Sequence, residues 1–322
     1  MGSLTFNDLV KELKSLKGNT AITFHSIGDV DAVASAFALQ HLVKGAEVRR
    51  IDSVNSQARK VWGRLNLNLD AFGEGELEKY DNLIFMDVST PALLGNLHNE
   101  FGKFKGKIIA IDHHLHNHPM KGEIYCDPKK TSCSEIVFGL FGAMGRKVED
   151  GDAILIALGI VSDTADLKSA NNSAIEALGE CLKGSTMDLQ EIYQLLEVRE
   201  DAAEKIAVME AVKRAQYERI GELLIASTQV SAFELKCASA LIGLGCDFAV
   251  VANQKEGKIS AVKGRAMELG KFNVGKEIDA AAKRFHGSGG GHEMVGGANF
   301  LHGLDAISAA DRLMAEVREQ IG

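Results

Sequence analysis

The sequence predicts an α/β protein of two domains, in which helices flank an N-terminal, mainly parallel sheet and a smaller α/β domain follows. In the first half, short apolar strands alternate with Ala- and Leu-rich helical segments, an alternation typical of βαβ units. A charged, glycine-free helical stretch then separates this part from a second group of strands and helices. We therefore expect a first domain over residues 1–187, linker helices over 188–219 and a second domain over 220–322.

The first domain opens its predicted sheet with the apolar segment Ala21–Phe24, and the Ala-rich segment that follows predicts a helix over Val30–Val43. Ligands of parallel sheets gather beyond the carboxyl ends of the strands, so polar residues directly after each strand are the first candidates for a site. The further expected elements are strands at Ala46–Ile51, Asn82–Met86 and Lys107–Ile111, and helices at Ser134–Met144 and Gly151–Ile160.

The linker and the second domain are predicted from the same kinds of pattern. Asp188–Tyr217 is charged and lacks glycine, which favours helices that connect two domains. Beyond it, apolar alternation predicts strands and a final amphipathic segment predicts a helix. The expected elements are strands at Glu222–Thr228, Phe248–Ala252 and Lys258–Val262, and helices at Ala232–Leu241 and Asp305–Ile321.

Composition limits the class of protein. With 322 residues, 46% of them hydrophobic, the chain can bury a large core, and no apolar run reaches the length of a membrane span. The N-terminus lacks the pattern of a signal peptide, and the five cysteines lack CxxC spacing, so we expect reduced thiols and a cytoplasmic enzyme without membrane contact. The formal charge of −8 argues against a long nucleic-acid track.

Imidazole and carboxylate side chains follow four apolar segments that lie far apart in the sequence. Because these segments deliver their next residues to one edge of a sheet, the side chains are expected to converge. The residues expected to converge are His25, Asp29, Asp31, Asp87, Asp112, His113, His114 and Asp163.

Each of these motifs has an ordinary structural explanation when taken alone. A lone His after a strand is usually structural, and an Asp-x-Asp pair such as Asp29 and Asp31 is common in caps and turns. Asp163 could be a helix N-cap, and the loop after Asp112 is rich in histidine. The conjunction of four such segments, each with ligand-type side chains, favours a metal centre over these separate explanations.

The ligand types indicate the metal and the chemistry. Mixed imidazole and carboxylate donors suit manganese, cobalt or ferrous iron better than the oxygen shell that magnesium prefers. A carboxylate from its own strand, such as Asp87, can bridge two ions about 3.5–4 Å apart, and such a pair activates water and neutralises phosphate oxygens. We expect two divalent ions, Mn²⁺ first, with Mg²⁺ or Co²⁺ as alternatives, and hydrolysis of phosphoesters.

On these motifs the chain resembles the DHH superfamily of phosphoesterases over nearly its whole length. The resemblance implies that His25, Asp29 and Asp87 hold one ion, and that Asp112 orients its neighbours while His114 faces the scissile phosphate. Gly28-Asp29-Val30-Asp31 stands where the family often has Pro-Asp-Gly-Asp. By the same resemblance, the second ion would be held by Asp31, Asp87, His113 and Asp163.

A glycine-rich stretch in the second domain, Gly287–Ala298, is the other informative motif. Successive glycines let backbone amides approach an anion closely, although a flexible turn explains such a run equally well. Upstream, Lys263 and Arg265 close a predicted strand within a segment that has an excess of basic residues. The pattern resembles the first type of DHH-associated domain, which implies that substrate is held by Arg265, Gly289, Gly290, Gly291 and His292.

The resemblance implies hydrolysis of very short oligonucleotides, as in nanoRNases, and of pAp-type nucleotides. Two enzymatic alternatives stay open, a RecJ-like single-strand exonuclease and a cyclic dinucleotide phosphodiesterase. A regulator that senses nucleotides without cutting them is the alternative outside enzymes. The expected partner is a short oligonucleotide or nucleotide, and a homodimer is an open alternative for the assembly.

Overall fold

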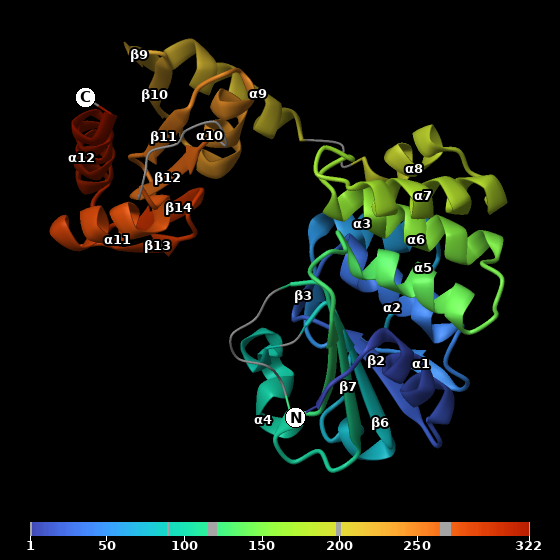
Figure 1. Ribbon diagram of the computed structural model, residues 1–322. Helices are drawn as coiled ribbons and strands as arrows, with labels where there is room; N and C mark the ends of the chain where they lie inside the picture. The colour runs from blue at the N-terminus through green and yellow to red at the C-terminus, as the bar shows by residue number, and fades with distance from the viewer. Residues whose placement is uncertain (1, 89, 115–120, 198–200, 265–271, 322) are drawn as a thin grey trace. The chain divides into compact units, whose positions relative to one another are not determined.

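A computed structural model describes residues 2–88, 90–114, 121–197, 201–264 and 272–321. The chain divides into two compact units, residues 1–198 and residues 199–322, which are described separately below (Figure 1). Each unit contains its own six-stranded sheet and its own buried apolar clusters. Among the described helices, none combines the length and the apolar composition that crossing a lipid bilayer requires.

The sheet of unit 1 is parallel throughout, with the strand order β1-β8-β7-β6-β2-β4. The central strands β2, β6 and β7 are almost wholly buried, which explains why their sequences are continuous apolar runs. Their bounds are β1 Gly2–Ser3, β2 Thr20–Phe24, β4 Ala46–Val48, β6 Asn82–Met86, β7 Lys107–Asp112 and β8 Glu123–Cys126; β3 Ile27–Gly28 and β5 Ser53–Val54 form a separate pair.

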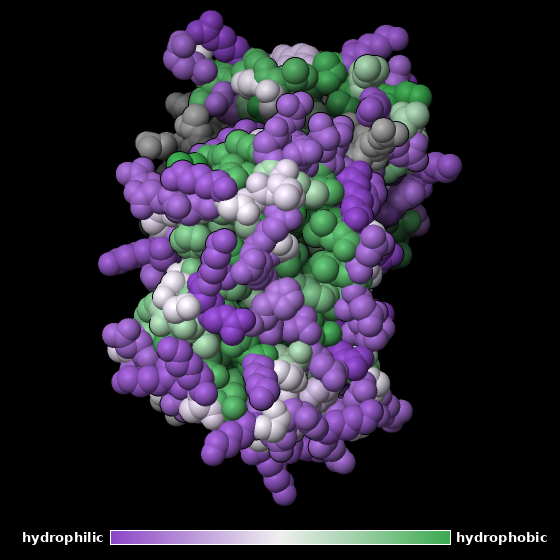
Figure 2. Space-filling model, turned by 90° about the vertical axis from the view of Figure 1, so that its right-hand side faces the viewer, coloured by the Kyte–Doolittle hydropathy of each residue, from purple (hydrophilic) through white to green (hydrophobic). Residues whose placement is uncertain are grey.

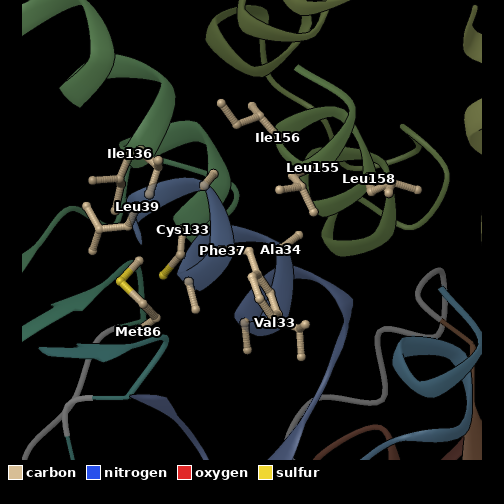
Figure 3. Packing of buried hydrophobic residues seen from close by; sticks show 14 of the residues in the cluster. Val33, Ala34, Phe37, Leu39, Met86, Cys133, Ile136, Leu155, Ile156 and Leu158 are labelled. Carbon is tan, nitrogen blue, oxygen red and sulfur yellow. The ribbon is translucent and has the colours of Figure 1, made fainter. Parts of the chain in front are cut away.

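Helices cover both faces of this sheet. One face, through Phe24, Met86 and Ile111, packs on a large cluster built by the helical layer that contains α2, α5 and α6 (Figures 1 and 3). The other face packs on Phe101 and Phe104 around the short helix α4. The helices are α1 Phe6–Ser15, α2 Val30–Gln40, α3 Ser56–Arg64, α4 His98–Phe101, α5 Cys133–Ala143, α6 Asp150–Asp163, α7 Asn172–Gly184 and α8 Leu189–Leu196, with 3-10 turns at Glu76–Lys79, Pro91–Leu93 and Gly95–Leu97.

The helices of unit 1 differ in composition because they lie in different layers. Helices α2 and α6 are apolar on nearly every side and are buried against each other and the sheet. Helix α7 instead buries only one stripe, at Ala174, Ala177, Leu178 and Cys181. In the view of Figure 2, hydrophilic side chains project over much of the visible face and hydrophobic atoms lie between them.

The sheet of unit 2 is mixed, with the order β13-β14-β12-β11-β10-β9, and β10 and β11 are its parallel pair. One face packs on α11 and α12, and the other packs on α9 and α10. The elements are α9 Ala202–Arg214, β9 Gln216–Ile220, β10 Leu223–Gln229, α10 Glu234–Gly243, β11 Phe248–Asn253, β12 Lys258–Lys263, α11 Val274–Arg284, β13 Ser288–Gly291, β14 Val295–Asn299 and α12 Gly303–Ile321.

The structure corrects several predicted boundaries. The helix expected to reach Val43 ends at Gln40, because the chain tightens into a turn in which Leu42 N–H bonds to the Leu39 carbonyl. The strand expected over Ala46–Ile51 ends at Val48, since Arg50 leaves the sheet edge to pair with Ala71. Gln216 and Tyr217 were expected to be helical but lie in β9, whose antiparallel pairing with β10 outweighs their local helical pattern. The strands β1, β3, β5, β8, β13 and β14 were not predicted.

Candidate metal centre

The register of three neighbouring strands sets the position of the site. Phe24 of β2 lies opposite Met86 of β6, and Met86 lies opposite Ile111 of β7. Because the strands are parallel, the residues that follow these three emerge together at the carboxyl edge of the sheet. Those residues are His25, Asp87 and Asp112.

A first group of ligand atoms forms around His25. Its Nε2 atom lies 3.7 Å from Asp29 Oδ2 and 3.6 Å from Asp87 Oδ2. The three side chains offer one ligand atom each within 4.8 Å of one another. Asp29 is also the N-cap of α2, since its Oδ1 accepts the Ala32 N–H at 2.9 Å. The capping role and a ligand role are compatible because they use different oxygens of Asp29.

A second group gathers around Asp31, in the first turn of α2. The Asp31 carboxylate is buried and accepts the backbone N–H groups of Cys133 and Ser134, at 2.7 and 2.9 Å. These amides begin α5, so a helix N-terminus stabilises the negative charge. Asp31, Asp87, His113 and Cys133 offer ligand atoms that all lie within 4.8 Å of one another.

His113 provides the test of whether this set fits a metal. Its Nε2 atom lies 3.5 Å from Asp87 Oδ1 and 3.1 Å from Asp163 Oδ2. The atom is buried and makes no well-aligned hydrogen bond to the described residues. Burial lowers the pKa of His113, but the Asp163 carboxylate lies close enough to raise it. A buried imidazole nitrogen surrounded by carboxylates and without a well-aligned hydrogen bond suits a divalent cation, so the residues fit a metal.

Without metal, the pocket destabilises the ionised forms of its buried carboxylates. Burial raises the pKa of Asp31 well above its usual value, and the charges of Asp163, Asp87 and Asp29 raise it further. Burial likewise raises the pKa of Asp87. Burial alone lowers the pKa of His25, but the carboxylates of Asp29 and Asp87 outweigh it, and the net pKa is raised. The clustered carboxylates of such a pocket are stabilised by protons or by bound cations.

Asp112 holds the two histidines that follow it. The carboxylate is fully buried, and its Oδ1 accepts the N–H groups of His113 at 2.6 Å and His114 at 2.9 Å. The same oxygen lies 3.0 Å from His114 Nδ1, and Asp87 Oδ1 lies 3.2 Å from that nitrogen. These hydrogen bonds, first to Asp112 and then to Asp87, raise the pKa of His114 to about 11, so its half-exposed ring carries a positive charge.

Asp163 occupies the last position of α6, so the alternative that it is an N-cap is wrong. The helix ends there because Ala165, Asp166 and Leu167 all adopt positive φ values of 50°, 58° and 69°. None of these is glycine, and the left-handed conformation of such residues is strained. Asp87 also has a positive φ, of 56°, so backbone strain is concentrated beside the ligand cluster.

Three residues near Asp31 were missed by sequence reasoning. Cys133 and Ser134 donate backbone N–H groups to the Asp31 carboxylate. Gly159 of α6 lacks a side chain and so leaves room for Asp31 and Ser134. A Cβ atom on Gly159 would lie 1.9 Å from Ser134 Oγ and 2.5 Å from Asp31 Oδ1. Nothing in the uniformly apolar sequence of α6 distinguishes this glycine, although a glycine within a helix is a weak signal of close packing.

The glycine-rich motif lies in unit 2 and forms a hairpin. Gly289, Gly290 and Gly291 belong to the edge strand β13, and exposed His292 follows them in the turn to β14. A Cβ at Gly289 would contact Ala298 at 2.7 Å and α11 beyond it, whereas a Cβ at Gly290 would meet nothing within 4 Å. Gly290 pairs with Gly297, which pairs with Ser260, so one face of the hairpin is a strip almost without side chains.

The expected substrate contact Arg265 lies outside the described residues. Its neighbour Lys263 is described and is buried. The Lys263 ammonium donates to the Phe272 carbonyl at 2.9 Å and lies 3.4 Å from Glu293 Oε1. This lysine therefore links β12 to the segment just before α11, and its charge is paired with Glu293 within unit 2.

The chain is similar in sequence to known proteins. Residues 19–160 match the DHH family, N-terminal domain. The bifunctional oligoribonuclease and PAP phosphatase NrnA of Thermus thermophilus is 25% identical over 320 residues, which cover 96% of this chain and 92% of that protein.

Solved structures show the same fold. An exopolyphosphatase-related protein from Bacteroides fragilis superposes with a TM-score of 0.76 at 18% identity, over 98% of this chain and 97% of that chain. The exonuclease RecJ bound to manganese superposes with a TM-score of 0.57 at 15% identity, over 98% of this chain and 95% of that chain.

Substitution of Gly159 by Ala tests the packing around Asp31. The added methyl must displace Asp31 or Ser134, so we expect Mn²⁺ affinity measured by calorimetry to fall about 10–100-fold. Gly179→Ala in α7 is the matched control, because a Cβ there meets nothing within 4 Å and both changes raise helix propensity equally. Equal Mn²⁺ affinities for the two variants would contradict this role of Gly159.

The pH dependence of Mn²⁺ binding follows from the raised pKa values of His25 and His113. Without metal, a raised folded pKa gives stability that is present below the usual histidine pKa and is lost as pH rises through the folded pKa. Mn²⁺ needs the deprotonated rings, so its affinity rises with pH. We expect the gap in Tm between Mn²⁺-loaded and chelated protein to widen from about pH 6 to about pH 8; a gap that narrows over this range would refute the expectation.

Proposed function

Because residues 19–160 match the DHH family, N-terminal domain, we propose that this protein is a metal-dependent phosphoesterase that hydrolyses very short oligonucleotides and pAp-type nucleotides. The observation that carries the proposal is that Asp87 belongs to all three potential ligand groups of the described residues. One group contains His25 and Asp29, a second contains Asp31, His113 and Cys133, and a third contains Asp112, His113 and His114. A carboxylate shared by two groups is the arrangement that a pair of ions requires.

In this proposal, His25, Asp29 and Asp87 would hold one ion. Manganese suits this mixed set of donors, with magnesium or cobalt as alternatives. Bound divalent ions supply Lewis acidity, which lowers the pKa of coordinated water and neutralises charge on phosphate. The second ion would be held by Asp31, Asp87, His113 and Asp163.

The protein's own residues would position the phosphate and stabilise its charge. His114 carries a positive charge at the partly exposed edge of the site, so it is suited to stabilise negative charge that develops on phosphate oxygens. Asp112 keeps that ring in place and sets the orientation of His113 through the backbone N–H groups. A fixed donor of this kind costs no reorganisation during the reaction.

Unit 2 would bind the nucleotide. The strip formed by Gly290, Gly297 and Ser260 lets a planar base or a sugar approach the backbone closely, and His292 adds a donor at its end. The N–H groups of Val274 and Gly275, at the start of α11, bond to the carbonyls of Glu293 and His292 at 3.0 and 2.9 Å. The turn that presents His292 is therefore held firmly.

A length series tests the substrate class. We expect purified protein with Mn²⁺ to hydrolyse dimers to pentamers with kcat/KM at least about tenfold above that for long single strands. The panel also contains pAp, cyclic dinucleotides and pyrophosphate, each assayed with Mn²⁺ and with chelator. Equal rates on long and short strands would overturn the short-substrate proposal in favour of an exonuclease, and an inactive panel would overturn the phosphoesterase itself.

Substitution of His114 by Ala tests the role of its charge. Loss of one preorganised donor should lower kcat about 100-fold with little change in Mn²⁺ affinity, because His114 is outside the proposed ligand sets. His302→Ala, at an exposed histidine of unit 2, is the control and should retain full activity. A His114 variant with normal kcat would contradict the proposed role.

A further inference from the structure

Cys133 is a buried thiol that the proposed chemistry does not use. It is the first residue of α5 and is fully buried. Figure 3 shows its sulfur on the side of α5 that faces the strand carrying Met86. That strand delivers Asp87 to the site, so the thiol lies at the inner wall of the ligand cluster.

The sulfur lies among ligand atoms. Cys133 Sγ is within 4.8 Å of ligand atoms of Asp31, Asp87 and His113. Its two described hydrogen bonds are long, at 3.8 Å to Asp87 Oδ1 and 3.6 Å to the Ile111 carbonyl. A thiol is a weak donor, so these contacts account poorly for placing sulfur beside carboxylates.

A second observation points to a ligand at the same place. His113 Nε2 belongs to the group that contains Cys133, its side chain is 10% exposed, and the atom makes no well-aligned hydrogen bond to the described residues. One cation between these atoms would satisfy the imidazole and give the sulfur a strong partner.

The ordinary explanation of a buried cysteine is that it fills the core as a small apolar residue. Cys181, Cys237 and Cys246 fit that explanation, because each lies in an apolar cluster and none belongs to a potential ligand group of the described residues. Cys133 lies in the apolar cluster and in a ligand group together, which distinguishes it from the other three.

We propose that Cys133 Sγ is a ligand of the divalent ion that binds at Asp31 and His113. This inference rests on the metal centre of the proposed function. As the sulfur–metal bond forms, the S–H bond breaks and the proton leaves to solvent. A thiolate is a soft ligand, so it shifts the preference of this position toward zinc, cobalt or iron and away from magnesium. The position next to His25 has oxygen and nitrogen ligands only.

X-ray absorption at the zinc edge tests the proposal on the unaltered protein. In the full chain loaded with Zn²⁺, we expect a sulfur shell at about 2.3 Å beside nitrogen and oxygen near about 2.0–2.1 Å. Absence of sulfur from the zinc shell of the wild-type protein would overturn the proposal without any variant.

Variants assign the sulfur. Cys133→Ser should lose the sulfur shell and bind Zn²⁺ at least about tenfold more weakly, with a smaller change for Mn²⁺. Cys181→Ser is the matched buried control, and Cys126→Ser tests the thiol that donates to the His114 carbonyl at 3.0 Å. Both should keep the shell. If Cys133→Ser fails to fold, retention of the shell in a Cys126/Cys181 double Ser variant still supports Cys133, and its loss there overturns the proposal.

The same samples separate this inference from the proposed function. Hydrolysis of short oligonucleotides together with a zinc shell that lacks sulfur would refute only the role of Cys133. A sulfur shell that depends on Cys133, in a protein inactive on every tested phosphoester, would refute only the phosphoesterase.

Discussion

The site depends on the register of β2, β6 and β7, which aligns the carboxyl ends of these three strands. Phe24, Met86 and Ile111 lie side by side in these strands. The next residues, His25, Asp87 and Asp112, therefore emerge together at one edge of the sheet. A slip of one residue in any of these pairings would move a ligand side chain into the core and an apolar side chain into the site. The ionisable residues that follow the three strands oppose such a slip, because it would bury an unpaired carboxylate or imidazole in the apolar core.

Burial of the carboxylates in this cluster is electrostatically unfavourable, and hydrogen bonds within the fold offset only part of that cost. Asp31 is satisfied by the first amides of α5, and Asp112 by the amides of the two histidines that follow it. Asp87 is instead surrounded by side chains. Ring nitrogens of His25, His113 and His114 lie 3.6, 3.5 and 3.2 Å from its oxygens, and the Cys133 thiol donates to Oδ1 at 3.8 Å. Burial nevertheless raises the pKa of Asp87. This carboxylate belongs to each of the three potential ligand groups of the described residues, and side chains rather than backbone amides surround it, as expected where a cation completes the structure.

The sequence was sufficient to predict β2, β4, β6 and β7 and the side chains that converge at the ends of β2, β6 and β7, because both follow from local rules. Apolar runs followed by His25, Asp87 or Asp112 identify strand ends, and parallel strands bring their ends together. Cys133, Ser134 and Gly159 could not be predicted, since their part in the site depends on how α5 and α6 pack against α2. The glycine run was open to several interpretations, and only pairing with β14 distinguishes the outward Gly290 from the inward Gly289.

Net charge and site chemistry together explain why metal and substrate would bind cooperatively. The chain carries a formal charge of −8, and its site concentrates carboxylates, so without metal a phosphate would meet repulsion there. The charge of His114 is already neutralised in part by Asp112 and Asp87. Attraction for phosphate therefore depends on bound cations, and by linkage a phosphate ligand must raise the affinity of the site for metal to the same degree.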